Sequence, residues 1–306
     1  AEKNPILIDK FIDNAMEVDV DAISDGKEVF VAGIMQHIEE AGIHSGDSAC
    51  VLPPYKITSS ALEQINIITK QLALKLGVIG LINIQFAYKD GEVYVLEVNP
   101  RASRTIPFVS KATNIPLARI AAQISVGATL DQFELQSWED RRHVAVKEAV
   151  LPFNKFPNES IFLSPEMKST GEVMGISNNL GEAFRKACIG AGNTLPKSGK
   201  VFISVNDTDK LDIISIARDF VELGFKLIGT ENTANALNKN GLSTQYVFKV
   251  GEGRPSIVDE IKNKKINLVI NTPMGSRSRY DEEAIGRACI RYGILAVTTL
   301  SCASFM

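Results

Sequence analysis

The sequence predicts two architectures in one chain. The first is an antiparallel or mixed sheet with helices (α+β), and the second is a parallel α/β sheet with helices on both faces. In the first part, two segments of alternating apolar residues flank Asp90-Gly91, a strong β-hairpin signal. In the last third, short apolar strands alternate strictly with helical segments. The glycine-rich stretch 190–199 separates the two patterns. We therefore predict domains over residues 1–192 and 193–306.

The predicted hairpin, residues 81–105, separates its apolar from its polar side chains because strand residues alternate between faces. Its expected core face holds Ile82, Ile84 and Phe86 from the first strand, and Tyr94, Leu96 and Val98 from the second. Gln85, Glu97 and Asn99 are expected to meet on the opposite face. Oxygen ligands without Cys or His suit a hard cation, Mg²⁺ or Mn²⁺, better than zinc.

Two arginines, Arg101 and Arg104, follow the polar residues within one turn. Cations and oxygen ligands at one place favour a phosphorylated ligand. The alternative is a hairpin whose polar face simply contacts water. The arginines and Pro100, directly after the polar residues, make the ligand site the preferred interpretation.

The hairpin sequence resembles the metal-binding strands of ATP-grasp ligases, through Gln85 and the run Glu-Val-Asn-Pro-Arg at 97–101. The continuation over residues 104–113 more narrowly resembles the large subunits of carbamoyl-phosphate synthetases. The resemblance extends over nearly the whole chain. It implies that Glu97 bridges two Mg²⁺ or Mn²⁺ ions, that Gln85 and Asn99 hold one each, and that Arg101 and Arg104 steady the transferred phosphoryl group.

A second hairpin is expected earlier in the chain, where Glu17–Ile23 alternates strictly and Asp25-Gly26 turns into residues 28–35. Glu17, Asp19 and Asp21 share one face, which could be a solvated acidic face. In ATP-grasp enzymes the corresponding linker contacts adenine, and a carboxylate at the start of the next strand holds the ribose. By resemblance these residues are Lys10, Ile12 and Glu17.

The polar segment 36–50 has no regular pattern and is predicted to be a ligand-contacting loop. Composition alone would make a lone His here a surface group. The resemblance instead places four residues against ATP: Gly42, Ile43, His44 and Ser45. It places Glu39 and Asp47 near a monovalent cation such as K⁺ and near the activator ornithine.

The rest of the first domain is predicted to be mainly scaffold. Helices are expected over residues 59–76, 116–126 and 182–189, and a buried strand over residues 144–151. Ser59 or Ser60 can cap the first helix. Glu148 is unusual inside an apolar strand; it either faces water at a sheet edge or, by resemblance, contributes to the ornithine site.

The last third resembles a methylglyoxal synthase-like effector domain, in which ligands bind at the carboxyl ends of the strands. The polar residues expected there are Lys210, Thr230, Thr233, Lys249, Asn271 and Thr272, with Arg277 beyond. Thr230 at a helix N-terminus suits a phosphate, and helix capping by Thr230 is compatible with this role. Thr298 is assigned to the ornithine site. Pro273 and Ala296 depart from the family pattern, so we expect weakened nucleotide binding and weak or missing ornithine activation.

Composition excludes several classes of protein. The net charge of −3 gives no reason to expect a nucleic-acid or membrane partner. The four cysteines form no C-x-x-C motif, and no targeting signal is visible, so we expect a cytoplasmic protein.

The resemblance implies ATP-dependent phosphorylation of carbamate to carbamoyl phosphate, with a glutaminase small subunit as partner and a nucleotide monophosphate as effector. The pathway, pyrimidine or arginine synthesis, stays open. The alternatives are a purely regulatory nucleotide-binding module and a different ATP-grasp carboxylate–amine ligase. The chain starts inside the ATP-grasp fold and lacks the glycine-rich lid strands, so we expect it to be part of a longer polypeptide and inactive alone.

Overall fold

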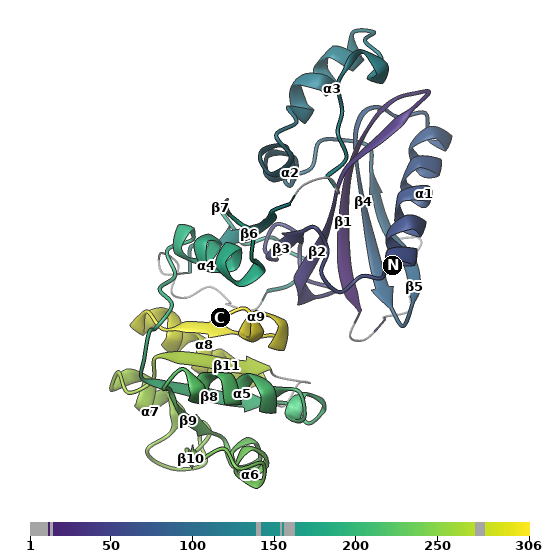
Figure 1. The fold of residues 1–306 in the computed structure, drawn as a ribbon. Helices are drawn as coiled ribbons and strands as arrows, with labels where there is room; N and C mark the ends of the chain where they lie inside the picture. Colours follow the sequence, from purple (N-terminus) through teal and green to yellow (C-terminus); the bar gives the residue numbers. More distant parts are fainter. Residues whose placement is uncertain (1–11, 13–14, 139–141, 154, 156–162, 273–278) are drawn as a thin grey trace, which may run out of the picture.

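The computed structural model describes residues 12, 15–138, 142–153, 155, 163–272 and 279–306. Within them the chain forms a seven-stranded antiparallel sheet and a five-stranded parallel sheet (Figure 1). This confirms the predicted fold class. The proposed ligand residue Lys10 lies outside the described residues. Among the described residues, no helix has the length and apolar character needed to cross a membrane.

The antiparallel sheet has the strand order β5-β4-β1-β2-β3-β6-β7. Its strands are β1 (Met16–Asp25), β2 (Val29–Glu40), β3 (Cys50–Leu52), β4 (Ile79–Lys89), β5 (Glu92–Asn99), β6 (Val144–Val150) and β7 (Gly171–Ser177). β2 continues to Glu40, so the prediction that residues 36–40 belong to an irregular loop was wrong. Pairing with β1 and β3 satisfies this polar segment's backbone, which its sequence pattern does not reveal. β7 was not predicted either.

The hairpin between β4 and β5 turns at Asp90 and Gly91, whose φ angles are 51° and 87°. Positive φ at both positions gives a two-residue turn that matches the twist of the strands, as Asp-Gly predicts. The apolar side chains of β1 and β4, including Val20 and Ile84, form one core cluster with residues of three helices. These helices are α1 (Ser59–Lys75), α2 (Ile106–Thr113) and α3 (Leu117–Ser125). Thr58, and neither predicted serine, caps α1 by accepting a hydrogen bond from the Ala61 amide.

The parallel sheet has the strand order β10-β9-β8-β11-β12. Its strands are β8 (Lys200–Val205), β9 (Lys226–Gly229), β10 (Thr244–Tyr246), β11 (Leu268–Thr272) and β12 (Leu295–Val297). The helices are α5 (Ile213–Glu222), α6 (Glu231–Lys239), α7 (Ile257–Lys262), α8 (Arg279–Tyr292) and α9 (Leu300–Ser304). Residues of α5, α6 and α9 pack in one core cluster and those of α7 and α8 in another, so both faces are covered as predicted.

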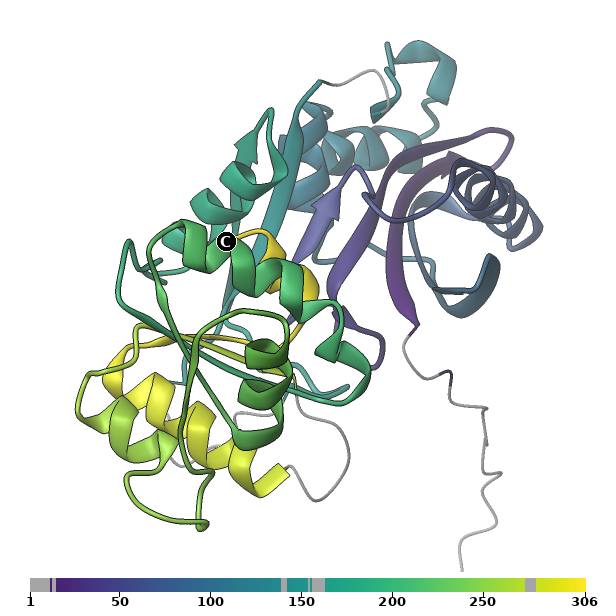
Figure 2. The same ribbon diagram turned by 60° about the horizontal axis from the view of Figure 1, so that its bottom comes forward.

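The two sheets are joined through α4 (Leu180–Gly190), which packs on β6 and β7, and through α9, which packs against β2 (Figures 1 and 2). Gly175 lets α4 approach closely, because a Cβ there would lie 1.9 Å from the Ala183 carbonyl oxygen. Phe305 contacts Tyr55 and Phe184 edge-on, at ring distances of 5.2 and 5.8 Å. The end of the second domain therefore shares a hydrophobic cluster with the first.

Candidate functional site

Two cross-strand rows of polar side chains run over β1, β4 and β5. Asp19 pairs with Gln85, which pairs with Glu97. In the next row Asp21 pairs with Asn83, which pairs with Asn99. The structure therefore brings Gln85, Glu97 and Asn99 to neighbouring positions, as the alternation predicts. The acids of β1 are buried and not solvated, whereas Glu97 is exposed.

The predicted apolar face of β5 was partly wrong. The pairing of β4 with β5 shifts between Gln85 and Phe86, so that Phe86 pairs with Val95 and Ala87 with Tyr94. This irregularity leaves Leu96 as the extra residue and turns Tyr94 to the face opposite that of Val98. Because β5 is also the edge strand, Tyr94 and Leu96 are 43% and 50% exposed.

The loop that carries the two arginines is anchored to β1 through Asp21. Ser103 Oγ donates to one Asp21 carboxylate oxygen at 2.7 Å, and Thr105 Oγ1 donates to the other at 2.6 Å. Asn83 also donates to Asp21, at 3.0 Å. Burial raises the pKa of Asp21 to about 6, although these hydrogen bonds oppose the shift. Arg101 and Arg104 are exposed on this anchored loop, and the guanidinium of Arg104 contacts Met167 Sδ.

A buried charge network continues from Asp19 to β2. His37 Nε2 lies 3.0 Å from Asp19 Oδ2, and His37 Nδ1 lies 3.9 Å from Glu17 Oε1. Burial alone would lower the pKa of His37, but the Cys50 sulfur and the Asp19 carboxylate raise it well above its usual range. His37 is therefore a buried cation between two carboxylates. Sequence reasoning noticed the acids but not this partner.

Lys147 on β6 is the second buried cation of this face, with a fully buried side chain. Its Nζ donates to the Ser45 carbonyl at 2.9 Å and lies 3.5 Å from Glu172 Oε1. Burial would lower the pKa of Lys147, but the Cys50 sulfur, Glu172, Asp19 and Glu39 raise it. Lys147 thereby holds Ser45, and with it the predicted ATP-contacting residues 42–45 (the nucleotide loop), against the sheet.

The nucleotide loop itself is ordered by local contacts. The Gly42 amide donates to Glu17 Oε2 at 3.4 Å, so two residues assigned to the nucleotide site are adjacent. The Gly46 amide donates to His44 Nδ1, and the His44 amide to the Ser164 carbonyl. Ile43 and Ile12 are partly buried.

The four residues assigned to ornithine are only partly brought together. Burial, and then the neighbouring Glu39 carboxylate, raises the pKa of Glu148 to about 8. Glu39 is bound by the Ala49 amide at 2.7 Å. The Asp47 carboxylate instead accepts hydrogen bonds from the Lys168 and Ser169 amides, at 2.8 Å each. Thr298, on the second domain, is exposed.

A row of hydroxyl and amide groups lies at the carboxyl ends of the parallel strands. Asn271 pairs with Ser204, whose Oγ lies 3.3 Å from Thr230 Oγ1, and Thr230 Oγ1 donates to Thr233 Oγ1 at 3.4 Å. Thr230 begins α6 without making a side-chain capping hydrogen bond, so its hydroxyl is not used as a cap. Ser204 was missed by sequence analysis, because nothing in a lone serine within an apolar strand indicates its neighbours.

The other predicted effector residues also lie at or after the carboxyl ends of strands. Lys210 forms an ion pair with Asp207, and Lys249 is partly buried just beyond β10. The Thr272 carbonyl and hydroxyl oxygens accept hydrogen bonds from Asn206, which ties β8 to β11. Pro273 and Arg277 lie outside the described residues. A cavity of about 270 Å³, lined by Phe220, Phe225 and Leu268 among others, lies near the opposite ends of the strands and is not part of this site.

The donor set on the antiparallel sheet fits a hard divalent cation. Glu97, an exposed carboxylate, pairs with Gln85 on the neighbouring strand, and Asn99 follows two residues later on the same strand. Carboxylate and amide oxygens are the ligands of Mg²⁺ and Mn²⁺. Within the described part of the chain, no cluster of three His, Cys, Asp or Glu residues could hold a metal.

Comparison with known proteins gives matches to both parts of the chain. The family model for the carbamoyl-phosphate synthase L chain ATP-binding domain matches residues 1–133, and the MGS-like domain model matches residues 212–298. Among solved structures, the biotin carboxylase domain of a single-chain bacterial carboxylase aligns with a TM-score of 0.49 and 15% identity, over 59% of this chain and 47% of that chain.

Curated relatives match almost the whole chain. The carbamoyl phosphate synthase large chain of Acidobacterium capsulatum is 52% identical over 99% of this chain and 28% of its own length. That of Archaeoglobus fulgidus is 54% identical over 98% of this chain and 28% of its own length. The chain thus spans a little over a quarter of the length of these relatives. From these matches and the two domain types we conclude that the chain belongs to the carbamoyl phosphate synthase large-chain family.

Proposed function

We propose that the polypeptide containing this chain uses ATP and Mg²⁺ or Mn²⁺ to phosphorylate carbamate, giving carbamoyl phosphate and ADP. The observation that carries this proposal is the row of Gln85, Glu97 and Asn99 beside the anchored loop of Arg101 and Arg104. Phosphoryl transfer needs positioning and charge neutralisation more than a covalent nucleophile. An oxygen-ligand site next to two arginines provides these elements.

Each residue has a proposed role in the transfer. Glu97 would bridge two divalent ions, and Gln85 and Asn99 would hold one each; bound there, the ions would neutralise phosphate charge. Arg101 and Arg104 would orient the phosphoryl group and carbamate. Glu17, Gly42, Ile43, His44 and Ser45 would contact the nucleoside, together with Ile12 and Lys10. Support comes from the contact of Glu17 with the Gly42 amide and from Lys147, which holds Ser45.

The buried network would keep these groups in place. Asp21 holds the arginine loop through two hydroxyls, and Asp19 holds His37. Because these partners are buried and bonded on several sides, the exposed ligands need little reorganisation when charge develops on the phosphoryl group. Preorganised charges of this kind are the largest source of rate enhancement in many enzymes.

We also propose that the parallel sheet binds a nucleotide monophosphate effector, with uridine monophosphate the first choice. Thr230 and Thr233, with Lys210 and Lys249 nearby, would bind its phosphate, and Asn271 and Thr272 would contact the rest of the molecule. The Thr230 hydroxyl, which does not cap α6 and makes only long hydrogen bonds, supports this assignment. An ornithine site would involve Glu39, Asp47, Glu148 and Thr298, with K⁺ nearby. Ala296, exposed on β12, offers no ring to such a site.

The remaining partners follow from the family. A glutaminase small subunit would supply ammonia, and the protein would act in the cytoplasm. The four cysteines, all free thiols, support this location.

The direct test is the back-reaction, in which ATP forms from ADP, Mg²⁺ and carbamoyl phosphate, measured on the complete polypeptide. Glu97→Gln keeps the side-chain volume but removes the bridging charge. The transition state should therefore lose about 3 kcal/mol or more of stabilisation, and the rate should fall accordingly. Glu92→Gln, at an exposed position of the same strand, is the matched control and should keep the activity. Near-normal activity of Glu97→Gln would remove Glu97 from the site. A wild-type protein that binds nucleotide but never forms ATP would favour a regulatory module.

A further inference from the structure

An exposed tyrosine stands directly beside the row of hydroxyls on the parallel sheet. In the strand register Tyr246 pairs with Gly229, the residue before Thr230. The Val247 amide also donates to the Gly229 carbonyl at 3.0 Å, which continues the pairing past the end of β10. Tyr246 is 42% exposed, whereas Thr230 and Thr233 are buried. The phenol ring therefore lies at the rim of the proposed phosphate site.

The side of the strand that Tyr246 occupies is fixed by its neighbours. Thr244, two residues earlier and on the same face, pairs with Leu227, whose side chain packs in the core cluster that includes Leu237 of α6. Tyr246 therefore lies on the face of the sheet that α6 covers. Partial desolvation, and then the carboxylates of Glu252 and Glu231, raise the pKa of the Tyr246 phenol. Because Glu231 is the first residue of α6, this electrostatic contact agrees with that placement.

A second ring holds Tyr246 in position. Phe248 contacts it edge-on, at a ring distance of 5.1 Å and an interplanar angle of 73°. Phe248 is itself fixed: its carbonyl accepts a hydrogen bond from the Ile257 amide at 2.9 Å, and Gly253 approaches its ring so closely that a Cβ there would lie 2.9 Å away. Phe248 thereby fixes the orientation of the Tyr246 ring, and the two residues are named here the aromatic pair.

The chemistry around the aromatic pair suits a nucleobase. An exposed ring can stack on any base, and such stacking tolerates different sequences because every base has a π face. The carboxylates of Glu231 and Glu252 near the phenol would accept hydrogen bonds from N–H groups on the edge of a base. The hydroxyl row lies beside Tyr246, where phosphate and sugar would bind.

We propose that the ring of Tyr246, held in place by Phe248, stacks on the base of the effector nucleotide whose phosphate binds at Thr230 and Thr233. Tyr246 would thereby distinguish nucleotides from simple sugar phosphates. The proposal rests on the proposed effector function and adds the contact that recognises the base. No covalent step is involved.

The test is calorimetric titration of the 306-residue chain with uridine 5′-monophosphate and with ribose 5-phosphate, which lacks only the base. Tyr246→Leu should raise the Kd for the nucleotide at least about fivefold, given the usual worth of one base–aromatic stack. The same variant should leave the Kd for ribose 5-phosphate unchanged. Tyr246→Phe keeps the ring and should bind both ligands as the wild type does. Thr230→Val should weaken both.

Each other outcome is decisive. An unchanged nucleotide Kd in Tyr246→Leu, or an equal loss for both ligands, would overturn the stacking role. A wild-type chain that binds ribose 5-phosphate as tightly as the nucleotide would keep the phosphate site and overturn the base contact. A wild-type chain that binds neither ligand would overturn the proposed effector function and the stacking role with it.

Discussion

The two sheets organise their polar residues in opposite ways. The face of the antiparallel sheet buries full charges: Asp19, Asp21, His37 and Lys147 are each at most 2% exposed. The strand ends of the parallel sheet use neutral hydroxyls instead, on Ser204, Thr230 and Thr233, linked by hydrogen bonds of 3.3–3.4 Å. One region pays a large desolvation penalty, and the other almost none.

This difference teaches what each region can do. A buried charge network is stable only while every partner is present, so it fixes its neighbours rigidly and tolerates little change. Weakly bonded hydroxyls can exchange their partners for a ligand at small cost. We therefore expect the antiparallel sheet to hold a preorganised catalytic site and the parallel sheet an adaptable effector site.

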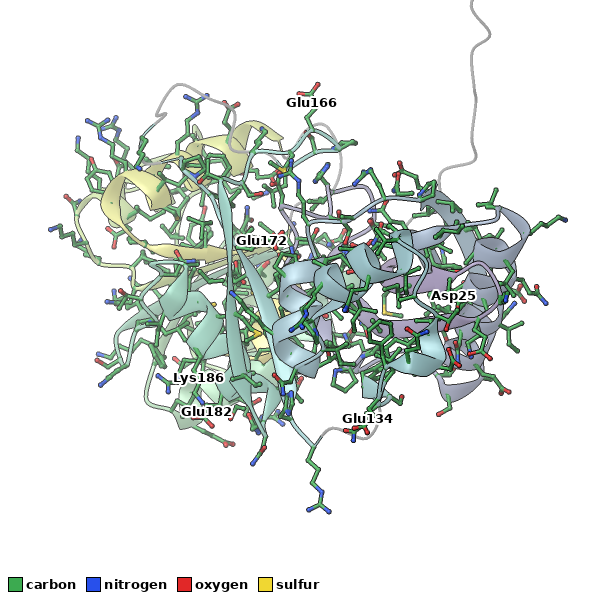
Figure 3. All side chains as sticks on the ribbon, turned by 90° about the horizontal axis from the view of Figure 1, so that it is seen from above. Asp25, Glu134, Glu166, Glu172, Glu182 and Lys186 are labelled. Carbon is green, nitrogen blue, oxygen red and sulfur yellow. The ribbon has the colours of Figure 1, made fainter. Side chains whose placement is uncertain are left out.

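The largest expected effect is on stability, from replacing Lys147 with Met. Removing this cation leaves Asp19, Glu39 and Glu172 without their shared partner, and breaking a buried pair costs about 3–5 kcal/mol. Lys186→Met is the matched control, because Lys186 and Glu182 form an exposed pair on α4 (Figure 3). The control should change the free energy of unfolding by less than about 1 kcal/mol. Urea unfolding measures both, and equal effects would contradict the buried network.

A middle-sized effect is expected on the pH dependence of stability. Burial raises the pKa of Glu148 from 4.5 to about 8, so folding favours its protonated form. The stability gained this way is complete below about pH 4.5 and is lost as the pH rises toward 8. Glu148→Gln removes this loss. The free energies of unfolding of the wild type and the variant should therefore diverge by up to about 1.4 kcal/mol per pH unit in this range.

Glu182→Gln provides the control of opposite sign. A hydrogen bond from Ser177, and then Lys186, lowers the pKa of Glu182, so its contribution is present at neutral pH and is lost on acidification. Parallel pH profiles for wild type and Glu148→Gln would show that Glu148 is ionised normally.

The smallest effect is expected at the hydroxyl row. Thr230→Val removes long hydrogen bonds and no cap, so the free energy of unfolding should fall by less than about 1 kcal/mol. Thr58→Val removes the cap of α1 and should cost about 1 kcal/mol or more. Thermal unfolding compares the two. A larger loss for Thr230→Val would make its hydroxyl structural and not adaptable.

The sequence predicted what depends on local pattern. Asp90-Gly91 predicted the hairpin because only residues that accept positive φ make its turn. The shift in pairing between Gln85 and Phe86, and not the turn, placed Gln85 opposite Glu97. The irregular pairing at Leu96 escaped prediction because an extra strand residue leaves no trace in composition.

The partners of the buried charges could not be predicted. His37 and Lys147 meet Asp19 through strand pairings between segments far apart in the chain. The sequence pattern of a strand does not distinguish a polar residue that faces water from one that faces a buried partner. Ser204 was missed for the same reason, and the burial of Asp19 and Asp21 became visible only once the strands were paired.

The most direct test of the central claim measures the binding of Mn²⁺ to the chain in the presence of ATP. Electron paramagnetic resonance quantifies the free ion. The account predicts that the wild type binds Mn²⁺, that Glu97→Gln weakens this binding at least about tenfold, and that Thr230→Val leaves it unchanged. Binding to Glu97→Gln as tight as to the wild type would contradict a metal site on the β4–β5 hairpin.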